Sequence, residues 1–418
     1  MSKKKTKKRR HPFLVFYALF VTATVLLAAW FYLPIDSYIA KHDAERKGYT
    51  VVSQPQELNY KYYYNHLKND ASKEAYTLIC SQLPDFPERI AVPNLSSEEV
   101  QEVYMAVSYD NPEFFFLGNT CQYMRFGAVF YFEPSYSMTR DQYIAQMDAV
   151  ESEANRLIAN LDAGASDYDK ELYIHDSLAA MADYKTASAT ESSVYTPYGL
   201  LIEHEANCEG YSRGMQYLLK RLGVVSRVIS GTGMSVTGTE NHMWNVVTVS
   251  GREYNVDVTW DDYIIDSSSG VTSTEPSHVF FNVDKTEMAA DHQPDDENLW
   301  ANCIWGDLNY YEWNGLQCDS YEAASRAVTR TLPRVLNEGK RSLELKFTNR
   351  DAFEDAKYQL IENDRIYYLI SSANVLAKPG NKVSTTKLQY NTDDDHMTMR
   401  FFFLRRVDLR TPGGVSNF

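Results

Sequence analysis

Cys208 occupies a position where a thiol can act as a nucleophile. The apolar residues that follow it recur at three- and four-residue steps, which predicts a helix: Tyr211, Met215, Leu218, Leu219 and Leu222. Gly223 ends that run, and Asn207 is a good N-cap, so Cys208 would lie in the first turn. There the backbone N–H groups and the positive end of the helix dipole favour a thiolate over a thiol. Such a cysteine becomes a nucleophile if a base lies nearby.

A predicted hairpin downstream can supply that base. Residues 242–249 and 252–258 are rich in aromatic and β-branched side chains, and Ser250-Gly251 joins them. A two-residue link that contains glycine between such runs is a hairpin signal. The first run begins with His242 and the second contains Asp257.

The register of this hairpin places the histidine and the aspartate on one sheet face. If Val249 pairs with Arg252, then His242 faces Thr259, and Asp257 lies diagonal to His242. Diagonal neighbours are about 7–8 Å apart at the backbone, which a His–Asp hydrogen bond can span. A cysteine at a helix start with a histidine and an aspartate on adjacent strands matches the nucleophile, base and orienting acid of a catalytic triad.

Five blocks around these residues resemble the core of the transglutaminase-like superfamily, in particular its bacterial extracytoplasmic branch: Tyr198 to Leu200, Asn207 to Ser212, Leu222-Gly223, Asn241 to Asn245, and Tyr254 to Asp262. Tyr173 to Asp176, continuing to Tyr184, resembles the helix that precedes this core, and the similar stretch covers roughly residues 165–295. The resemblance implies an α+β fold with a papain/transglutaminase-like core, in which the catalytic helix packs on an antiparallel sheet.

The same resemblance implies roles for the three residues. Cys208 would be the nucleophile, His242 the general base and acid, and Asp257 the residue that orients the imidazole. The expected chemistry is thioester formation from a protein or peptide amide, followed by transfer to an amine or to water. The substrates would be proteins or peptides at the cell surface or in the cell wall, and no cofactor is expected.

Each of these residues also has an ordinary structural interpretation. Free cysteine is among the most buried residue types, a lone histidine is commonly a hydrogen-bonded structural residue, and a lone aspartate commonly ends a strand or forms a turn. The order, shared face and flanking sequence of Cys208, His242 and Asp257 favour catalysis instead. The alternative is a non-catalytic surface protein that binds or scaffolds with its acidic, tyrosine-rich flanks.

The N-terminus predicts a membrane anchor. The first eleven residues hold seven Lys or Arg and no acid, and residues 13–33 carry no charge before Pro34. Twenty-one such residues span a hydrocarbon core of about 30 Å. The basic flank predicts a cytoplasmic N-terminus and an extracytoplasmic catalytic region. A signal peptide is the competing interpretation, but the apolar run is long and no clear cleavage site follows it.

Charge and composition exclude some partners. Because the whole chain carries −15 and its first eleven residues carry +7, the part that follows carries −22. An acidic ectodomain argues against nucleic acid as a partner, because phosphate binding needs a basic surface. The acids are dispersed and form no calcium-loop pattern, so we expect no dedicated metal.

The chain contains five cysteines. An odd number leaves at least one thiol free. The economical assignment pairs Cys80 with Cys121 and Cys303 with Cys318, leaving Cys208 reactive, and free buried thiols are the alternative for the other four.

We predict six parts along the chain: a basic cytoplasmic tail (1–12), a transmembrane helix (13–33), a stalk (34–59), an N-terminal α+β region (60–164), the catalytic core (165–295), and a C-terminal α/β or α+β appendage (296–418). In the flanking regions we expect helices over 58–83, 96–108, 139–161 and 350–361, and strands over 114–117, 128–132, 342–347, 365–371 and 397–404. The polar loop 267–274 would either gate the site or be a solvated excursion with no role. We assign His278 and His292 structural roles.

Overall fold

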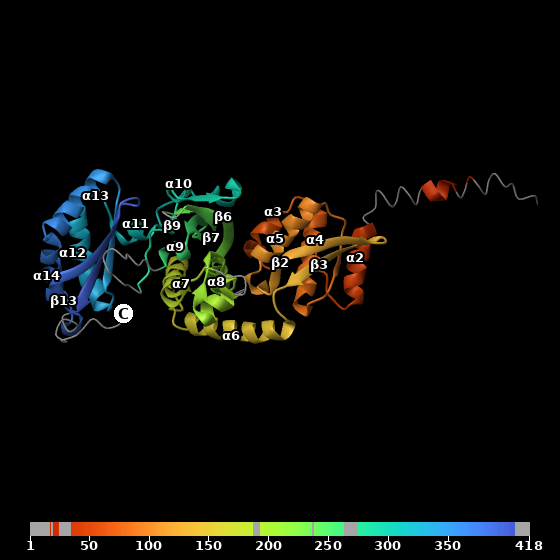
Figure 1. Cartoon of the computed structure of the whole chain (residues 1–418), viewed down its shortest axis with the longest axis horizontal. Helices are drawn as coiled ribbons and strands as arrows, with labels where there is room; N and C mark the ends of the chain where they lie inside the picture. Colours follow the sequence, from red (N-terminus) through yellow and green to blue (C-terminus); the bar gives the residue numbers. More distant parts are fainter. Residues whose placement is uncertain are drawn as a thin grey trace, which may run out of the picture. The chain divides into compact units, whose positions relative to one another are not determined.

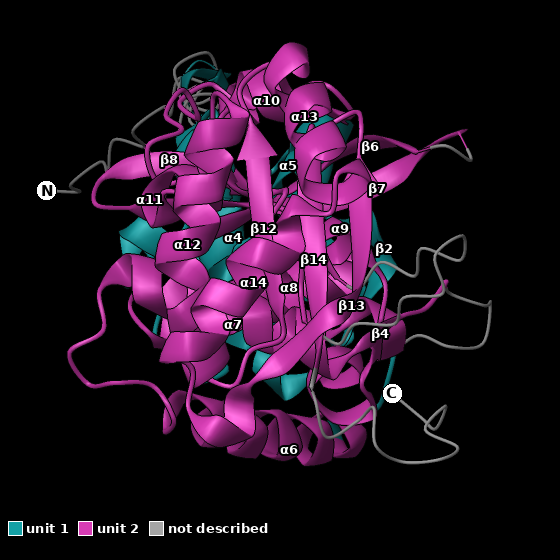
Figure 2. Cartoon of the chain, turned by 90° about the vertical axis from the view of Figure 1, so that its left-hand side faces the viewer, with its two compact units in different colours: residues 1–140 teal, residues 141–418 magenta. Residues whose placement is uncertain are grey.

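The computed structural model describes Tyr17 and residues 20–24, 35–186, 193–235, 238–262 and 275–405. The chain divides into two compact units, residues 1–140 and 141–418 (Figure 1 and Figure 2). The predicted cytoplasmic tail, most of the predicted transmembrane segment and the loop 267–274 lie outside the described residues. A search of the described helices finds none with the length and apolar character that a membrane span requires.

The first unit packs helices on a small antiparallel sheet of strand order β1-β3-β2. The strands are β1 (Ile90–Val92), β2 (Leu117–Phe126) and β3 (Val129–Tyr136), and the longer helices are α4 (Asp70–Gln82) and α5 (Ser97–Tyr109). Ser96 and Glu99 form a reciprocal capping box that begins α5, which confirms the helix predicted over 96–108.

Three expectations for this unit were wrong. The residues assigned to a stalk include helix α2 (Ile35–Arg46), whose Ala40 and Ala44 are buried against Leu78 and Ala91. The helix predicted over 58–83 is interrupted, because only α3 (Tyr62–His66) and α4 are α-helical within it. The strand predicted over 114–117 is instead a 3-10 turn, Pro112–Phe114, and β2 begins only at Leu117.

A five-stranded sheet of order β10-β6-β7-β8-β9 forms the centre of the second unit. Its strands are β6 (Val225–Ser235), β7 (Gly238–Val249), β8 (Arg252–Val256), β9 (Phe281–Val283) and β10 (His292–Pro294). All four strand pairs are antiparallel. β10 follows β9 in the sequence but pairs with β6 at the opposite edge of the sheet.

The hairpin β7–β8 has the predicted register, with Val249 opposite Arg252. Its turn residues Ser250 and Gly251 both have positive φ, as a two-residue hairpin turn of the primed type requires. The second strand is shorter than expected. It ends at Val256 because Asp257 caps the short helix α9 (Val258–Asp261), so Thr259 is helical and does not lie opposite His242 in the sheet.

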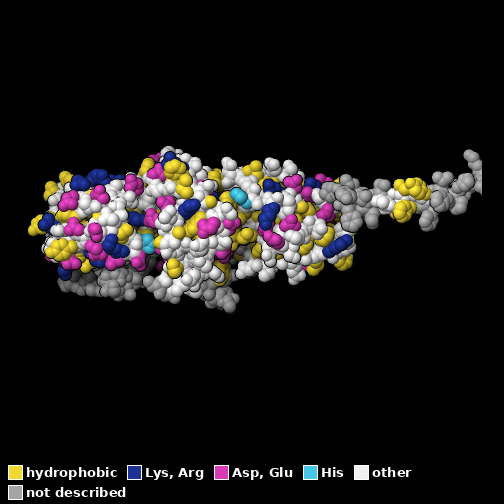
Figure 3. Space-filling model, turned by 90° about the horizontal axis from the view of Figure 1, so that it is seen from above, with side chains coloured by type: hydrophobic (Ala, Val, Ile, Leu, Met, Phe, Trp, Pro, Cys, Tyr) yellow, Lys and Arg dark blue, Asp and Glu magenta, His cyan; other side chains and the backbone are white. Residues whose placement is uncertain are grey.

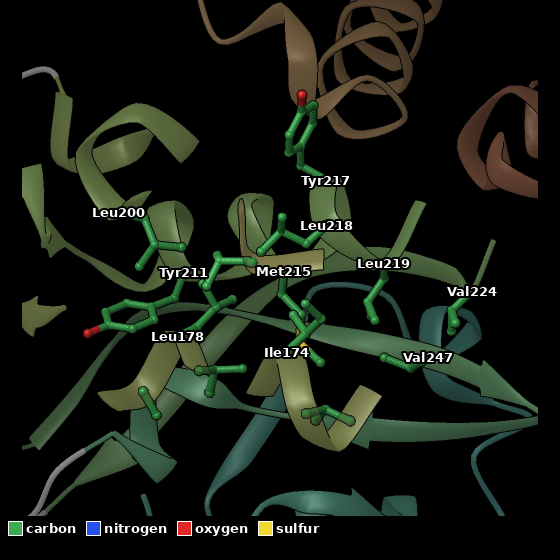
Figure 4. Close-up of a cluster of buried hydrophobic side chains, with 14 of the residues drawn as sticks. Ile174, Leu178, Leu200, Tyr211, Met215, Tyr217, Leu218, Leu219, Val224 and Val247 are labelled. Atoms are coloured by element: carbon green, nitrogen blue, oxygen red, sulfur yellow. The ribbon is translucent and has the colours of Figure 1, made fainter. Parts of the chain in front are cut away.

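Helix α8 (Cys208–Arg221) begins and ends where the sequence predicted, with the cap at Asn207 and Gly223 at positive φ. It packs between helix α7 (Asp167–Met181) and the sheet. Figure 4 shows Met215 and Leu219 of α8 directed toward Ile174 of α7 and Val247 of β7. Burying side chains of this size contributes roughly 1.5–3 kcal/mol each, so the position of the Cys208 helix is fixed by its apolar face.

Helix α6 (Arg140–Ile158) lies almost wholly in the second unit, whereas we expected residues up to 164 in the N-terminal region. The physical reason is its buried face. Val150, Ala154 and Leu157 join the hydrophobic cluster that contains α7 and α8.

The C-terminal segment has its own sheet, of order β11-β12-β14-β13, within the second unit. The strands are β11 (Gln317–Cys318), β12 (Ser342–Phe347), β13 (Val383–Asp393) and β14 (Thr398–Arg405), and the helices are α12 (Tyr321–Asn337), α13 (Arg350–Lys357) and α14 (Arg365–Leu376). The strand predicted over 365–371 is therefore wrong. Ile366, Ile370 and Ala373 are buried on one helical face of α14.

All five cysteines are free thiols in the structure, so the predicted pairs Cys80–Cys121 and Cys303–Cys318 are wrong. Each thiol has its own surroundings. Cys80 accepts a hydrogen bond from the Asn111 amide, and the buried Cys318 donates to the carbonyl of Leu316. Cys80, Cys121, Cys303 and Cys318 are therefore free thiols, which was the alternative to the two disulfides.

Acidic and basic side chains are interspersed over the face shown in Figure 3. The net negative charge is therefore not gathered into one acidic patch on that face, in agreement with the dispersed acids of the sequence.

Candidate active site

The Cys208 side chain projects from the first turn of α8. The Asn207 side chain accepts a hydrogen bond from the backbone N–H of Gly210 at 3.1 Å, which fixes the start of the helix. Gly210 has no room for a side chain, because a Cβ there would lie 2.3 Å from the carbonyl oxygen of Val194. Cys208 itself is partly exposed, unlike the buried Cys303 and Cys318. The helix start therefore holds the thiol where a substrate can reach it.

His242 lies within β7, opposite Gly231 of β6. Its side chain is 3% exposed, and the centres of the Trp244 and Trp260 rings are 6.2 and 5.3 Å from its own. Gly233 leaves space for this packing, since a Cβ there would lie 2.8 Å from the Trp260 ring and 3.3 Å from His242. The imidazole is thus held by rigid neighbours on a central strand.

Asp257 lies directly after β8 and contacts both the imidazole and the start of α9. Its Oδ1 accepts from the backbone N–H groups of Thr259 at 2.9 Å and Trp260 at 3.4 Å. Its Oδ2 is 2.6 Å from Nε2 of His242. One carboxylate therefore caps a helix and orients the ring, and the structure brings it to His242 by a helix cap rather than by a longer strand.

The Cys208 thiol lies close enough to His242 to help raise the pKa of its imidazole. The structure thus places His242 in direct contact with Asp257, and Cys208 is near enough to affect the imidazole.

Electrostatics favours a charged imidazole at this position. Burial alone lowers the pKa of His242, but the charge and hydrogen bond of Asp257 and the hydrogen bond of Cys208 together raise it to about 10. Burial likewise raises the pKa of Asp257, and the neighbouring His242 and His292 outweigh it and hold that pKa well below its usual range. An imidazolium beside the thiol stabilises a thiolate by charge.

His292, to which the sequence assigned only a structural role, is a second partner of Asp257. Its Nε2 is 3.1 Å from Oδ2 of Asp257, and its Nδ1 is 2.5 Å from Asp291. Burial lowers its pKa, and the hydrogen bonds to the two carboxylates raise it. His292 is brought here by β10, which pairs with β6 beside His242.

The hydrogen-bonded chain continues into the C-terminal segment. Oδ2 of Asp291 is 3.0 Å from Nε2 of His396, and Nδ1 of His396 is 2.9 Å from Asp393 at the end of β13. Burial lowers the pKa of His396, and its bonds to Asp291 and Asp393 raise it to about 9. Alternating imidazoles and carboxylates therefore connect the Cys208 site to the β13–β14 hairpin. No spacing in the sequence signals this contact, because it joins residues 105 positions apart.

Tyr184 is a further polar side chain near the thiol that sequence reasoning missed. It lies in the short strand β4 (Asp183–Tyr184), which pairs in parallel with β5 (Glu205–Ala206) just before Cys208. Burial, and then the charge of Cys208, raise the pKa of the Tyr184 hydroxyl to about 12. A hydroxyl with a raised pKa stays neutral and can donate a hydrogen bond. His278, by contrast, contacts Asp176 and Glu344 rather than this site.

A comparison with known proteins points to one superfamily. The family model described as the transglutaminase-like superfamily matches residues 155–258, which include α7, Cys208, His242 and Asp257. The chain is 26% identical over 165 residues to kyphoscoliosis peptidase of Mus musculus, covering 37% of this chain and 25% of that protein. It is 27% identical over 126 residues to kyphoscoliosis peptidase of Homo sapiens, covering 28% of this chain and 19% of that protein. The chain thus spans a quarter or less of each relative's length.

Solved structures show weaker similarity. A crystal structure of a TGase matches 41% of this chain and 50% of its own, with 15% identity and a TM-score of 0.25. A candidate cysteine protease from Cytophaga hutchinsonii matches 38% of this chain and 66% of its own, with 11% identity and a TM-score of 0.23. The family match and the two relatives identify the segment that carries Cys208, His242 and Asp257 as a domain of the transglutaminase-like superfamily.

Proposed function

We propose that the protein is a cysteine enzyme that forms a thioester between Cys208 and an amide of a protein or peptide. The observation that carries this proposal is the 2.6 Å contact between the buried imidazole of His242 and Asp257, close to the partly exposed Cys208. A buried structural cysteine needs no such partners. A nucleophile needs a base within hydrogen-bonding reach, and the base needs an orienting group.

In the first half of the reaction, the Cys208 thiolate attacks the carbonyl carbon of the amide. The carbonyl π electrons move onto oxygen, and the negative charge faces the N-terminus of α8, where the Cys208 backbone N–H can donate to it. The hydroxyl of Tyr184 is the neighbouring side chain that offers a second donor. The imidazolium of His242 then gives its proton to the departing amine, the C–N bond breaks, and a thioester remains.

In the second half, an amine or a water molecule attacks the thioester. The now neutral imidazole accepts a proton from this nucleophile, the C–S bond breaks, and the Cys208 thiolate re-forms beside the imidazolium. Attack by an amine gives a new amide, and attack by water gives a carboxylic acid. Exclusion of water from the thioester decides between the two outcomes.

Hydrolysis of a peptide bond is the outcome that we favour. Its support is the name of the two curated relatives, each called a peptidase, although the chain covers only part of their length. Crosslinking by transamidation uses the same thioester and differs only in the acceptor. Asp257 contributes to both halves of the reaction, because it holds the ring of His242 in one orientation while the proton moves.

We also propose that the catalytic region is held outside the cytoplasm by the apolar segment 13–33. The support is the sequence: a run of basic residues followed by an uncharged stretch of bilayer length. Surface proteins and the peptide parts of a cell wall are the substrates that fit this location. Protease treatment of intact cells tests it, since an external catalytic region would be cleaved and a cytoplasmic one would be protected.

The enzymatic proposal is tested by two assays on the same preparation. One follows incorporation of a labelled primary amine into a glutamine-containing protein, and the other follows release of peptides from an unfolded protein substrate. We expect one of the two activities in the wild type and neither in the Cys208→Ala variant. A Cys303→Ala variant is the matched control, because it removes a buried thiol elsewhere. If the folded wild type shows neither activity with several substrates, the enzymatic proposal is wrong. The alternative of a non-catalytic surface protein that binds or scaffolds is then favoured.

A further inference from the structure

A second group of histidines and carboxylates lies in the second unit, apart from Cys208. His175 and Asp176 are consecutive residues of α7, and His278 precedes β9. One oxygen of Asp176 is 3.1 Å from Nδ1 of His175 and 3.0 Å from Nε2 of His278. The ligand atoms of the three residues all lie within 4.8 Å of one another. Two imidazoles thus converge on one carboxylate oxygen.

The spacing of these atoms matches tetrahedral coordination of one ion. With zinc–ligand bonds of about 2.0–2.1 Å, neighbouring ligand atoms in a tetrahedron are about 3.3 Å apart. The two nitrogen–oxygen distances of 3.1 and 3.0 Å differ from that by only a few tenths of an ångström. Two imidazoles on one tetrahedral zinc have ring centres about 5 Å apart, and the centres of His175 and His278 are 5.4 Å apart.

Each imidazole also has a carboxylate behind it. Nε2 of His175 is 3.2 Å from Asp261, and Nδ1 of His278 is 3.0 Å from Glu344. Metal-binding histidines typically donate their second N–H to a carboxylate, which fixes the ring and makes the ligating nitrogen more basic. Both histidines have this arrangement, with Nδ1 of one and Nε2 of the other left for the ion.

The charges of the cluster favour a dication. Asp176, Asp261 and Glu344 supply three carboxylates, and the only guanidinium paired with them among the described residues is Arg400, 3.0 Å from Glu344. Asp261 and Glu344 are almost fully buried, where an unbalanced charge is costly. A bound dication balances the remaining two negative charges and leaves both imidazoles neutral.

One side of the cluster is open. The side chain of Asp176 is 28% exposed, and with His278 and Tyr310 it lines a cavity of about 390 Å³ within the second unit. Sites with three protein ligands keep a fourth position for water or for a ligand from solution. The cavity therefore provides the entry path for an ion and the room for its fourth ligand.

We propose that His175, Asp176 and His278 form a zinc site, in which Asp261 and Glu344 accept hydrogen bonds from the second nitrogen of each imidazole. This departs from the expectation of no dedicated metal, and it requires nothing of the thioester chemistry. The site connects elements that the active site also needs: Asp257 caps α9 and Asp261 ends it. Zinc bound here holds α9 against α7, and Glu344 of β12 joins the C-terminal sheet to the same centre.

The test is a zinc titration of the full-length protein, prepared without a histidine tag and stripped of metal by a chelator. Binding is followed by competition with a chromophoric zinc indicator, in a Cys208→Ala background that removes the reactive thiol. We expect one equivalent to bind tightly and the midpoint of thermal unfolding to rise, because an ion that binds only the folded state stabilises it. Cobalt substitution should give the visible absorption of a tetrahedral site.

Variants locate the site. We expect Asp176→Asn to abolish the tight equivalent and Glu344→Gln to weaken it by about 10- to 100-fold. Glu338→Gln, which changes an acid lining the same cavity, should leave it unchanged. His242→Gln should also leave it unchanged, since His242, Asp257 and His292 form a separate group with ligand-like spacing. The proposal is overturned if the folded protein binds no tight equivalent, or if the equivalent survives Asp176→Asn.

Discussion

The contact between Asp257 and His242 leads to a quantitative prediction. Replacing Asp257 by asparagine keeps the size of the side chain but removes its charge. The amide also carries a donor where the carboxylate accepts from four N–H groups, those of Thr259, Trp260, His242 and His292. With the amide oxygen toward the backbone N–H groups, the cap of α9 is kept and the amide NH2 faces the two imidazoles. The variant therefore loses the charge that stabilises the imidazolium.

The magnitude follows from the pKa of His242. The rise from its ordinary 6.5 to about 10 corresponds to about 5 kcal/mol, at 1.36 kcal/mol for each pH unit. Because burial opposes the rise, Asp257 and Cys208 together must contribute more than this net figure. Without Asp257, burial dominates. We therefore expect the pKa of His242 to fall to 6.5 or below in Asp257→Asn.

The assay is a pH titration by NMR of protein with ¹³C-labelled histidine, in which His242→Gln identifies the resonance. Asp284→Asn is the matched control, because Asp284 caps α10 (Lys285–Met288) in the same way that Asp257 caps α9. Asparagine caps a helix about as well as aspartate, so both variants keep their caps, but only Asp257→Asn should change the titration of His242. A His242 resonance that titrates near pH 10 in folded Asp257→Asn would refute the reasoning.

Three further predictions concern the same site. Because the pKa of His242 is raised in the folded state, the stabilisation of the fold by its imidazolium is fully present below pH 6.5 and is lost as pH rises through about 10. The midpoint of thermal unfolding should therefore fall over that range, and it should fall less in His242→Gln. His396→Asn should lower kcat about 10-fold with little change in KM, because it weakens the charged hydrogen bond to Asp291, which contacts Asp257 through His292. Asp394→Asn, an exposed change in the same hairpin, should leave kcat unchanged. Equal kcat values in the wild type and His396→Asn would show that His396 does not affect the active site. Gly233→Ala should reduce kcat about 10- to 100-fold by displacing the His242 ring, whereas Gly306→Ala, where a Cβ has room, should have no effect on steady-state rates.

Local signals were enough to predict the elements that carry the candidate site. The helix that begins at Cys208 has an apolar face and a capping asparagine, and the hairpin has a two-residue turn that sets its register. These features depend on neighbours in the sequence. The extension of β8 to Val258 was wrong because Asp257 uses one of its oxygens to cap α9, and a strand pattern does not show that competition.

Contacts between distant segments could not be predicted in this way. His292 reaches Asp257 because β10 pairs with β6, and His396 reaches Asp291 because the C-terminal sheet packs in the same unit. The run Ile366-Tyr367-Tyr368-Leu369-Ile370 is short and apolar, and such runs fit either a strand or a buried helix. Its burial on one face of α14 was settled by packing against the C-terminal core.

The most direct test of the central claim is competitive alkylation of the native full-length protein. Brief treatment with limiting iodoacetamide near pH 7 is followed by peptide mass mapping of all five cysteines. We predict that Cys208 is labelled first, and that His242→Gln slows its labelling at neutral pH while leaving the other four thiols unchanged. If Cys208 is inert until the protein is denatured, or if its labelling rate does not depend on His242, then it is not an activated nucleophile.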